Sequence, residues 1–183
     1  MDNTALALII IPPVFAGLGY IIKFCIDKSY KKTHLINKNK LEEIEFKLKN
    51  FFFPIYTNLL RENTIWNKIL NVYTSEDFKI IFELDKEILS SHLENQKIIH
   101  EHIISINPSH ELLEVLNMYD EHVMVYNILR KLEPNTDPTI HSLEHMKYPG
   151  NFNVPYPIKL TELIEKELNS LREKQENIYN SMV

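Results

Sequence analysis

Eight side chains capable of acid–base, metal-binding or anion-binding chemistry lie on the apolar faces of two neighbouring predicted helices. With roughly 100° between successive helical residues, four of them share the hydrophobic stripe of the first helix and four share that of the second. Polar groups in such places bind one another or a ligand, because unpaired polar groups are rarely buried. The eight residues are Asp85, His92, Gln96 and His100 in the first helix, and Tyr119, His122, Tyr126 and Arg130 in the second.

The two helices, predicted at residues 76–106 and 109–132, should form an antiparallel hairpin. Asn107 and Pro108 interrupt the helical pattern between them, and Ser109 is expected to cap the second helix. A hairpin brings residues at equal distances from its turn side by side. The expected pairs are Asp85 with Arg130, His92 with His122 or Val123, and Gln96 with Tyr119.

Two interpretations of this polar cluster remain open. In the first, the eight side chains form a buried polar network that fixes the register of the helices. In the second, the cluster is a functional site, in which His92, His122 and Asp85 bind zinc or another divalent ion. Arg130 with His92 could instead hold an anionic group.

The sequence contains no motif for a particular reaction. It lacks the Glu-x-x-His pattern of di-iron bundles, the metalloprotease histidine pair, a serine nucleophile elbow and an arginine–histidine nuclease pattern. His141 and His145 have the i, i+4 spacing of a metal pair, but the prolines around them favour solvated histidines. We therefore predict no catalytic residue, no metal ligand and no cofactor, and a protein that is not an enzyme.

Helical spacing of apolar residues predicts an all-α fold, an antiparallel bundle of about four helices behind an N-terminal transmembrane helix. The first bundle helix, over residues 38–72, should be kinked or split at Pro54. The aromatic run Phe51–Phe53 before this proline is assigned to the core. A long proline-rich loop over residues 133–156 precedes a last helix over residues 158–179.

The start of the chain carries a hydrophobic run long enough to cross a membrane. Residues 5–26 read ALALIIIPPVFAGLGYIIKFCI with Lys23 as their only charge, and these 22 residues would extend about 33 Å as a helix. The alternatives are a cleaved signal peptide, a buried core helix and an interfacial helix, which would need a charged face. Pro12 and Pro13 are expected to bend the first turns. We predict a single-pass membrane anchor.

Lysines follow this run, whereas the residues before it include no lysine or arginine. The positive-inside rule then places the N-terminus outside and the C-terminal domain in the cytosol. The basic side chains nearest the run should face lipid head groups. They are Lys23, Lys28, Lys31 and Lys32.

Charge divides the chain sharply. The first 40 residues hold six lysines and two aspartates, a net +4, which leaves −9 for the remainder of a chain whose total is −5. An acidic domain is poorly suited to phosphate backbones, so we predict no nucleic-acid partner. The expected organisation is a membrane anchor at residues 1–28, a basic juxtamembrane linker at 29–40 and an acidic helical bundle at 41–183.

Four segments resemble known proteins when taken in their order along the chain. They read FFFPIYTNLLRENTIW from Phe51, NPSHELL from Asn107, EHVMVYNILRKL from Glu121 and VPYPIKLTELIEKEL from Val154. Over residues 41–170 they resemble uncharacterised single-pass helical membrane proteins encoded by large DNA viruses of protists. The resemblance implies a viral origin and a location in a virion or host membrane, and it assigns no catalytic residue.

These features predict a membrane-anchored helical protein-interaction or scaffold module. The anchor would hold the chain at a lipid bilayer, while the acidic bundle or its proline-rich loop contacts a protein partner. One alternative is a small metal- or anion-dependent enzyme that uses the polar cluster. Another is a structural component of a viral or cellular membrane assembly, in which the chain forms homo-oligomers.

Overall fold

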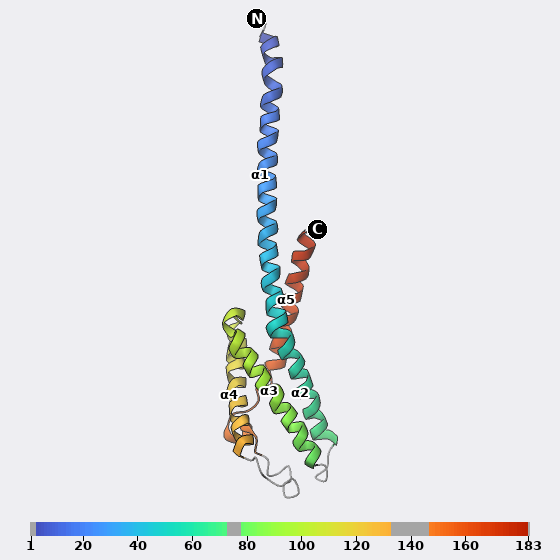
Figure 1. Cartoon of the computed structure of the whole chain (residues 1–183), viewed down its shortest axis with the longest axis vertical. Helices are drawn as coiled ribbons and strands as arrows, with labels where there is room; N and C mark the ends of the chain where they lie inside the picture. The colour runs from blue at the N-terminus through green and yellow to red at the C-terminus, as the bar shows by residue number, and fades with distance from the viewer. Residues whose placement is uncertain (1–2, 73–77, 133–146, 183) are drawn as a thin grey trace. The chain divides into compact units, whose positions relative to one another are not determined.

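A computed structural model describes the backbone of residues 3–72, 78–132 and 147–182, and the side chains of residues 20, 22–68, 80–132 and 147–182. Within these ranges every regular element is helical, so the predicted all-α class is confirmed (Figure 1). The elements are α1 (Asn3–Lys47), η1 (Leu48–Phe52), α2 (Phe53–Val72), α3 (Phe78–Ile106), α4 (His110–Leu132), η4 (Pro149–Phe152) and α5 (Leu160–Met182).

The chain divides into two compact units. The first contains residues 1–44 and 175–183, and the second contains residues 45–174. In the first unit, the Asn37 side chain donates a hydrogen bond to the Ser181 hydroxyl at 3.2 Å. All of the residues discussed below as a functional site belong to the second unit.

The described residues contain no helix with the length and hydrophobicity of a membrane span. The predicted span at residues 5–26 falls largely on residues whose side chains lie outside the described set. The large apolar side chains that are described near its end, among them Ile22, Phe24 and Ile26, are more than half exposed. The predicted divisions after residues 28 and 40 fall within α1 and stay predictions.

The predicted kink at Pro54 takes the form of a π-helical turn, η1, directly before the proline. The backbone N–H of Phe53 donates to the Leu48 carbonyl, five residues back. Proline lacks an N–H and crowds the carbonyl of the preceding turn, and a wider turn relieves that crowding. The side chain of Asn50 donates to the Phe46 carbonyl at 3.0 Å and so supports the same turn. Of the aromatic run assigned to the core, Phe51 and Phe52 are buried as predicted, whereas Phe53 is only half-buried.

The hairpin has the predicted ends. Helix α3 stops at Ile106, Asn107 adopts a left-handed conformation with φ of 49°, and α4 runs from His110 to Leu132. The Leu112 backbone N–H donates to the Ser109 hydroxyl at 3.4 Å, which confirms the predicted N-cap. Figure 1 shows α3 and α4 side by side and antiparallel.

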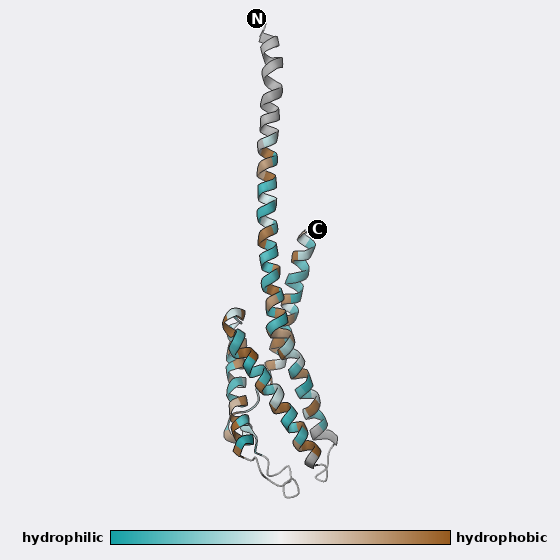
Figure 2. Ribbon diagram, viewed as in Figure 1, coloured by the Kyte–Doolittle hydropathy of each residue, from teal (hydrophilic) through white to brown (hydrophobic). Residues whose placement is uncertain are grey.

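Helices α2, α3 and α4 and the first part of α5, residues 160–174, form the second unit and are in contact. Helix α2 packs against α3, and α3 packs against α4. Helix α5 is joined to α2 by the Arg172 guanidinium, 4.7 Å from the centre of the Phe53 ring, and by a hydrogen bond from Asn63 to Thr161. Figure 2 shows hydrophobic and hydrophilic residues alternating around these helices, as amphipathic packing requires. The predicted bundle therefore forms.

Candidate functional site

A cavity of about 640 Å³ lies among α2, α3, α4 and the segment from Tyr148 to Thr161. That volume is typical of sites for small molecules. Its walls combine apolar and aromatic side chains with a few polar groups, which come from α2, α3, α4 and the segment at the start of α5. Among the lining residues are Glu62, Trp66, His92, His122, Tyr126 and Tyr156.

Asp85 and Arg130 form a buried ion pair beside this cavity. Arg130 donates from Nε to Asp85 Oδ2 at 2.5 Å and from Nη2 to Oδ1 at 3.0 Å, and the Tyr126 hydroxyl also donates to Oδ1. Arg130 Nη1 donates to the Lys147 carbonyl at 2.8 Å. Burial lowers the pKa of Arg130, but its hydrogen bonds to the carboxylate outweigh that effect and raise it. Burial, reinforced by the charge of Asp85, raises the pKa of Tyr126. The two opposite charges are therefore matched.

Glu62 forms a second buried polar group with residues of α3 and α4. Its side chain is only 5% exposed, and Oε1 accepts a hydrogen bond from Asn95 at 3.2 Å. The Asn95 amide nitrogen also donates to the Tyr119 hydroxyl at 3.0 Å, and Asn95 Oδ1 accepts a hydrogen bond from Asn58 at 2.9 Å. His92 Nδ1 lies 2.8 Å from the Tyr119 oxygen and 3.2 Å from Glu62 Oε2. Among the described residues, Oε2 nevertheless has no hydrogen-bond partner.

His122 and Tyr156 complete the polar part of the cavity. His122 Nδ1 donates to the Val154 carbonyl at 3.0 Å, which makes Nε2 the acceptor of the neutral ring. Burial lowers the pKa of His122, the bond to Val154 partly offsets this, and the nearby His92 lowers it further. Burial and then the charge of Glu62 raise the pKa of Tyr156, and the Thr161 side chain close by lowers it. In the described part of the chain, the buried Tyr156 hydroxyl makes no hydrogen bond of regular geometry.

The predicted pairing of Gln96 with Tyr119 is wrong. Gln96 donates to Asp120 Oδ1 at 2.9 Å, and His100 Nε2 lies 2.7 Å from the same oxygen. Tyr119 is fully buried and is occupied by His92 and an amide of α3, whereas the Asp120 carboxylate stands one residue further along at the half-exposed edge. The His100 side chain is 61% exposed, so it lies outside the buried network to which it was assigned.

The remaining predicted residues do come together: Asp85 with Arg130 and Tyr126, and His92 with Tyr119. The centres of the His92 and His122 rings lie 5.8 Å apart. The sequence prediction missed Asn58 and Glu62. Their signal is present in the sequence, because both share the helical face of the buried Ile55 and Leu59.

The metal and anion sites that the sequence left open as alternatives find little support in the geometry. No group of three histidine, cysteine or acidic side chains among the described residues is placed to hold a metal ion. Asp85 is engaged by Arg130 and Tyr126 instead of the histidines. Arg130 in turn donates hydrogen bonds to Asp85 and to a backbone carbonyl, so few of its N–H groups remain to bind an anion. His141 and His145 lie outside the described residues.

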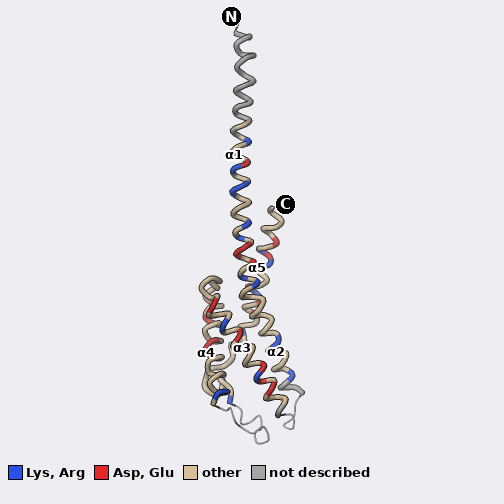
Figure 3. The backbone as a smooth tube through the Cα atoms, viewed as in Figure 1, with Lys and Arg blue, Asp and Glu red and all other residues tan. Residues whose placement is uncertain are grey.

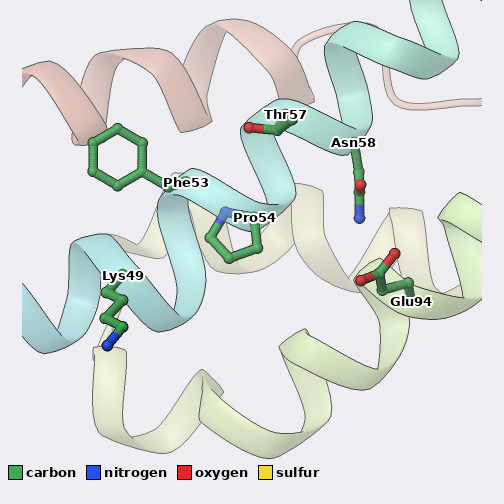
Figure 4. Close-up of a pocket in the computed structure, with 6 residues that line it drawn as sticks. All are labelled: Lys49, Phe53, Pro54, Thr57, Asn58 and Glu94. Atoms are coloured by element: carbon green, nitrogen blue, oxygen red, sulfur yellow. The ribbon is translucent and has the colours of Figure 1, made fainter.

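A second, shallower pocket of about 480 Å³ lies at the π turn. Figure 4 shows Lys49 and Glu94 on opposite sides of it, with Pro54 between them. Its polar groups do not converge on one point, and Asn58 is already bonded to Asn95. The larger cavity is therefore the better candidate for a functional site.

No protein-family model, no curated protein and no solved structure matches this chain. The function must therefore be argued from the residues and geometry of the chain itself.

Proposed function

We propose that the protein is a membrane-anchored helical module whose bundle binds a small ligand in the cavity between α2, α3 and α4. The observation that carries this proposal is a pair of polar atoms in residues that line the cavity, Glu62 Oε2 and the Tyr156 hydroxyl, which have no satisfied hydrogen bond within the described part of the chain. Leaving a buried polar atom unpaired costs about 1–3 kcal/mol, and more if it is charged. A ligand that pairs with these atoms would recover that free energy.

The anchor rests on the hydrophobic run at residues 5–26 and on the lysines that follow it. Ile22, Phe24 and Ile26 are 57–61% exposed, and a lipid bilayer would cover such side chains. Figure 3 shows lysines along the described part of α1 below this run. In this proposal Lys23, Lys28, Lys31 and Lys32 contact head groups, the N-terminus lies outside and the bundle lies in the cytosol. The membrane of a virion or its host, implied by the resemblance, belongs to the same proposal.

Ligand binding can be tested with the only tryptophan of the chain, because Trp66 lines the cavity. The full chain in a non-ionic maltoside detergent is screened against a fragment library by Trp66 fluorescence and thermal unfolding. We expect fragments that shift the emission and also raise the unfolding temperature. Thr161→Phe, which narrows the cavity, should abolish both effects. Thr57→Phe at the shallower pocket is the matched control. Fragments that bind equally well to both variants would contradict the cavity as the site.

The anchor and its direction can be tested with cysteine labelling, because Cys25 is the only cysteine. In a Cys25→Ser background, Asn3→Cys and Ser181→Cys each provide one thiol for an impermeant maleimide. In inside-out vesicles we expect labelling at residue 181 and none at residue 3. Extraction of the chain by alkaline carbonate would contradict a membrane-spanning anchor.

A protein-interaction or scaffold role is the second candidate. It is favoured by an exposed apolar face of α4, where Met124, Ile128 and Leu132 are 50%, 48% and 75% exposed at successive i, i+4 positions. A homo-oligomeric membrane assembly would use the same face. Light scattering of the full chain in detergent separates these roles from an isolated binding module, because a strict monomer would count against an assembly.

A further inference from the structure

Resting on the proposed ligand cavity, we propose that its ligand is a primary amine in its protonated form, with an apolar or aromatic body. Of the described residues that line the cavity, Glu62 is the only one with a formal charge, apart from the two histidines. A buried carboxylate requires a counter-charge, because desolvating an isolated anion is very costly.

The protein itself supplies that counter-charge poorly. The Arg130 guanidinium beside the cavity is matched to Asp85 through two hydrogen bonds, and Arg61, next to Glu62 in the chain, pairs with Glu87. Protonated His92 could serve through Nδ1, 3.2 Å from Glu62 Oε2. Nδ1 also lies 2.8 Å from the Tyr119 hydroxyl, which can donate to it when the ring is neutral. A cationic ligand would supply the missing counter-charge.

The hydrogen-bonding groups around the cavity specify the kind of cation. An alkylammonium group carries three N–H donors and no acceptor. The cavity offers matching acceptors in Glu62 Oε2, the Tyr156 hydroxyl oxygen and Nε2 of His122. The His122 and Tyr156 rings are neighbours, with centres 5.5 Å apart. A quaternary ammonium ion has no N–H donors for these acceptors. A metal ion would need a cluster of ligands, and the described residues form no such cluster.

The body of the ligand would lie against the aromatic and aliphatic walls. Trp66 and Tyr148 meet edge to face with ring centres 5.6 Å apart, and both line the cavity together with Ile88 and Ile158. Aromatic faces attract cations as well as apolar groups, so these walls favour an amine over an anion of the same shape.

The test is a titration of the full chain, in a non-ionic maltoside detergent, with four compounds that share one phenyl body. They are 2-phenylethylamine, its N,N,N-trimethyl derivative, 2-phenylethanol and 3-phenylpropionate. Binding is followed by Trp66 fluorescence and by calorimetry. We expect the primary amine to bind at least about 10-fold more tightly than the other three, the range for a hydrogen bond to a charged group.

Glu62→Gln keeps the shape of the side chain and removes its charge. It should weaken binding of the primary amine about 10-fold or more and leave that of 2-phenylethanol unchanged. Glu101→Gln, on the exposed face of α3, makes the same change in net charge and should alter neither. Equal affinity for the amine and the alcohol, or no effect of Glu62→Gln on amine binding, would overturn the amine proposal and leave a ligand cavity standing. If none of the four compounds binds while library fragments do, the amine proposal also fails; if library fragments fail as well, the proposed function fails with it.

Discussion

Replacing Arg130 by methionine should destabilise the bundle strongly. The Asp85 side chain is 1% exposed, and the variant would leave its carboxylate with only the hydrogen bond from the Tyr126 hydroxyl. Removing one partner of a buried ion pair costs about 3–5 kcal/mol, because the other charge remains desolvated. For a unit of this size, that loss lowers the unfolding temperature by roughly 10–20 °C. Urea unfolding of the full chain in maltoside, followed by circular dichroism, measures the loss of free energy, and a thermal scan measures the fall in unfolding temperature.

Two further variants separate pairing from simple loss of an arginine. The double variant Asp85→Asn with Arg130→Met removes both charges, so it should recover a large part of the lost stability. Arg61→Met is the matched control, because Arg61 also pairs with a carboxylate, Glu87, but both side chains are 54% exposed. Exposed pairs contribute about 0–1 kcal/mol. Equal losses from Arg130→Met and Arg61→Met, or no recovery in the double variant, would refute the reasoning.

Three other outcomes follow from the described contacts. Because the pKa of His122 is lowered on folding, the unfolded chain binds the proton more tightly, and stability should fall as the pH drops below about 6.5. Urea unfolding at pH 5.5 and 7.5 measures this dependence. His122→Asn should flatten it, whereas His110→Asn, at an exposed position, should not. Ser109→Ala removes the cap of α4 and should lower the free energy of unfolding by about 1 kcal/mol, and an unchanged urea midpoint would contradict the cap. Glu62→Gln removes a buried carboxylate, one oxygen of which has no hydrogen bond from the described residues, so the unfolding temperature should stay constant or rise. A large fall would show that the charge stabilises the fold.

Helical periodicity was sufficient for the fold of the bundle. The interruption at Asn107 and Pro108 placed the hairpin turn, and Pro54 marked the point where the first bundle helix needs a wider turn. These features are local, because proline and capping residues act on the turn that contains them. The sequence did not indicate that the turn before Pro54 is π-helical, since that depends on how Phe51 and its neighbours pack into the core.

Helical periodicity predicted only part of the candidate site. Asp85 and Arg130 could be paired from the hairpin because a short turn fixes the register of its two helices. Glu62 comes from α2, and residues 73–77, between α2 and α3, gave no register for that contact. Tyr156 lies in a segment without periodicity, so nothing local could place it at the cavity. Contacts between distant segments depend on the packing of the whole bundle.

The two buried carboxylates of the bundle have opposite surroundings, and that contrast bears on function. Asp85 accepts hydrogen bonds from Arg130 and Tyr126 at both oxygens, so the requirements of folding account for it completely. Glu62 is buried almost as deeply, yet one oxygen has no hydrogen-bond partner among the described residues. An amide in its place would make the same bond to Asn95 without the cost of a buried charge. A carboxylate that folding does not require is better explained by a ligand, and this is the ground on which we propose Glu62 as the ligand-binding group of the cavity.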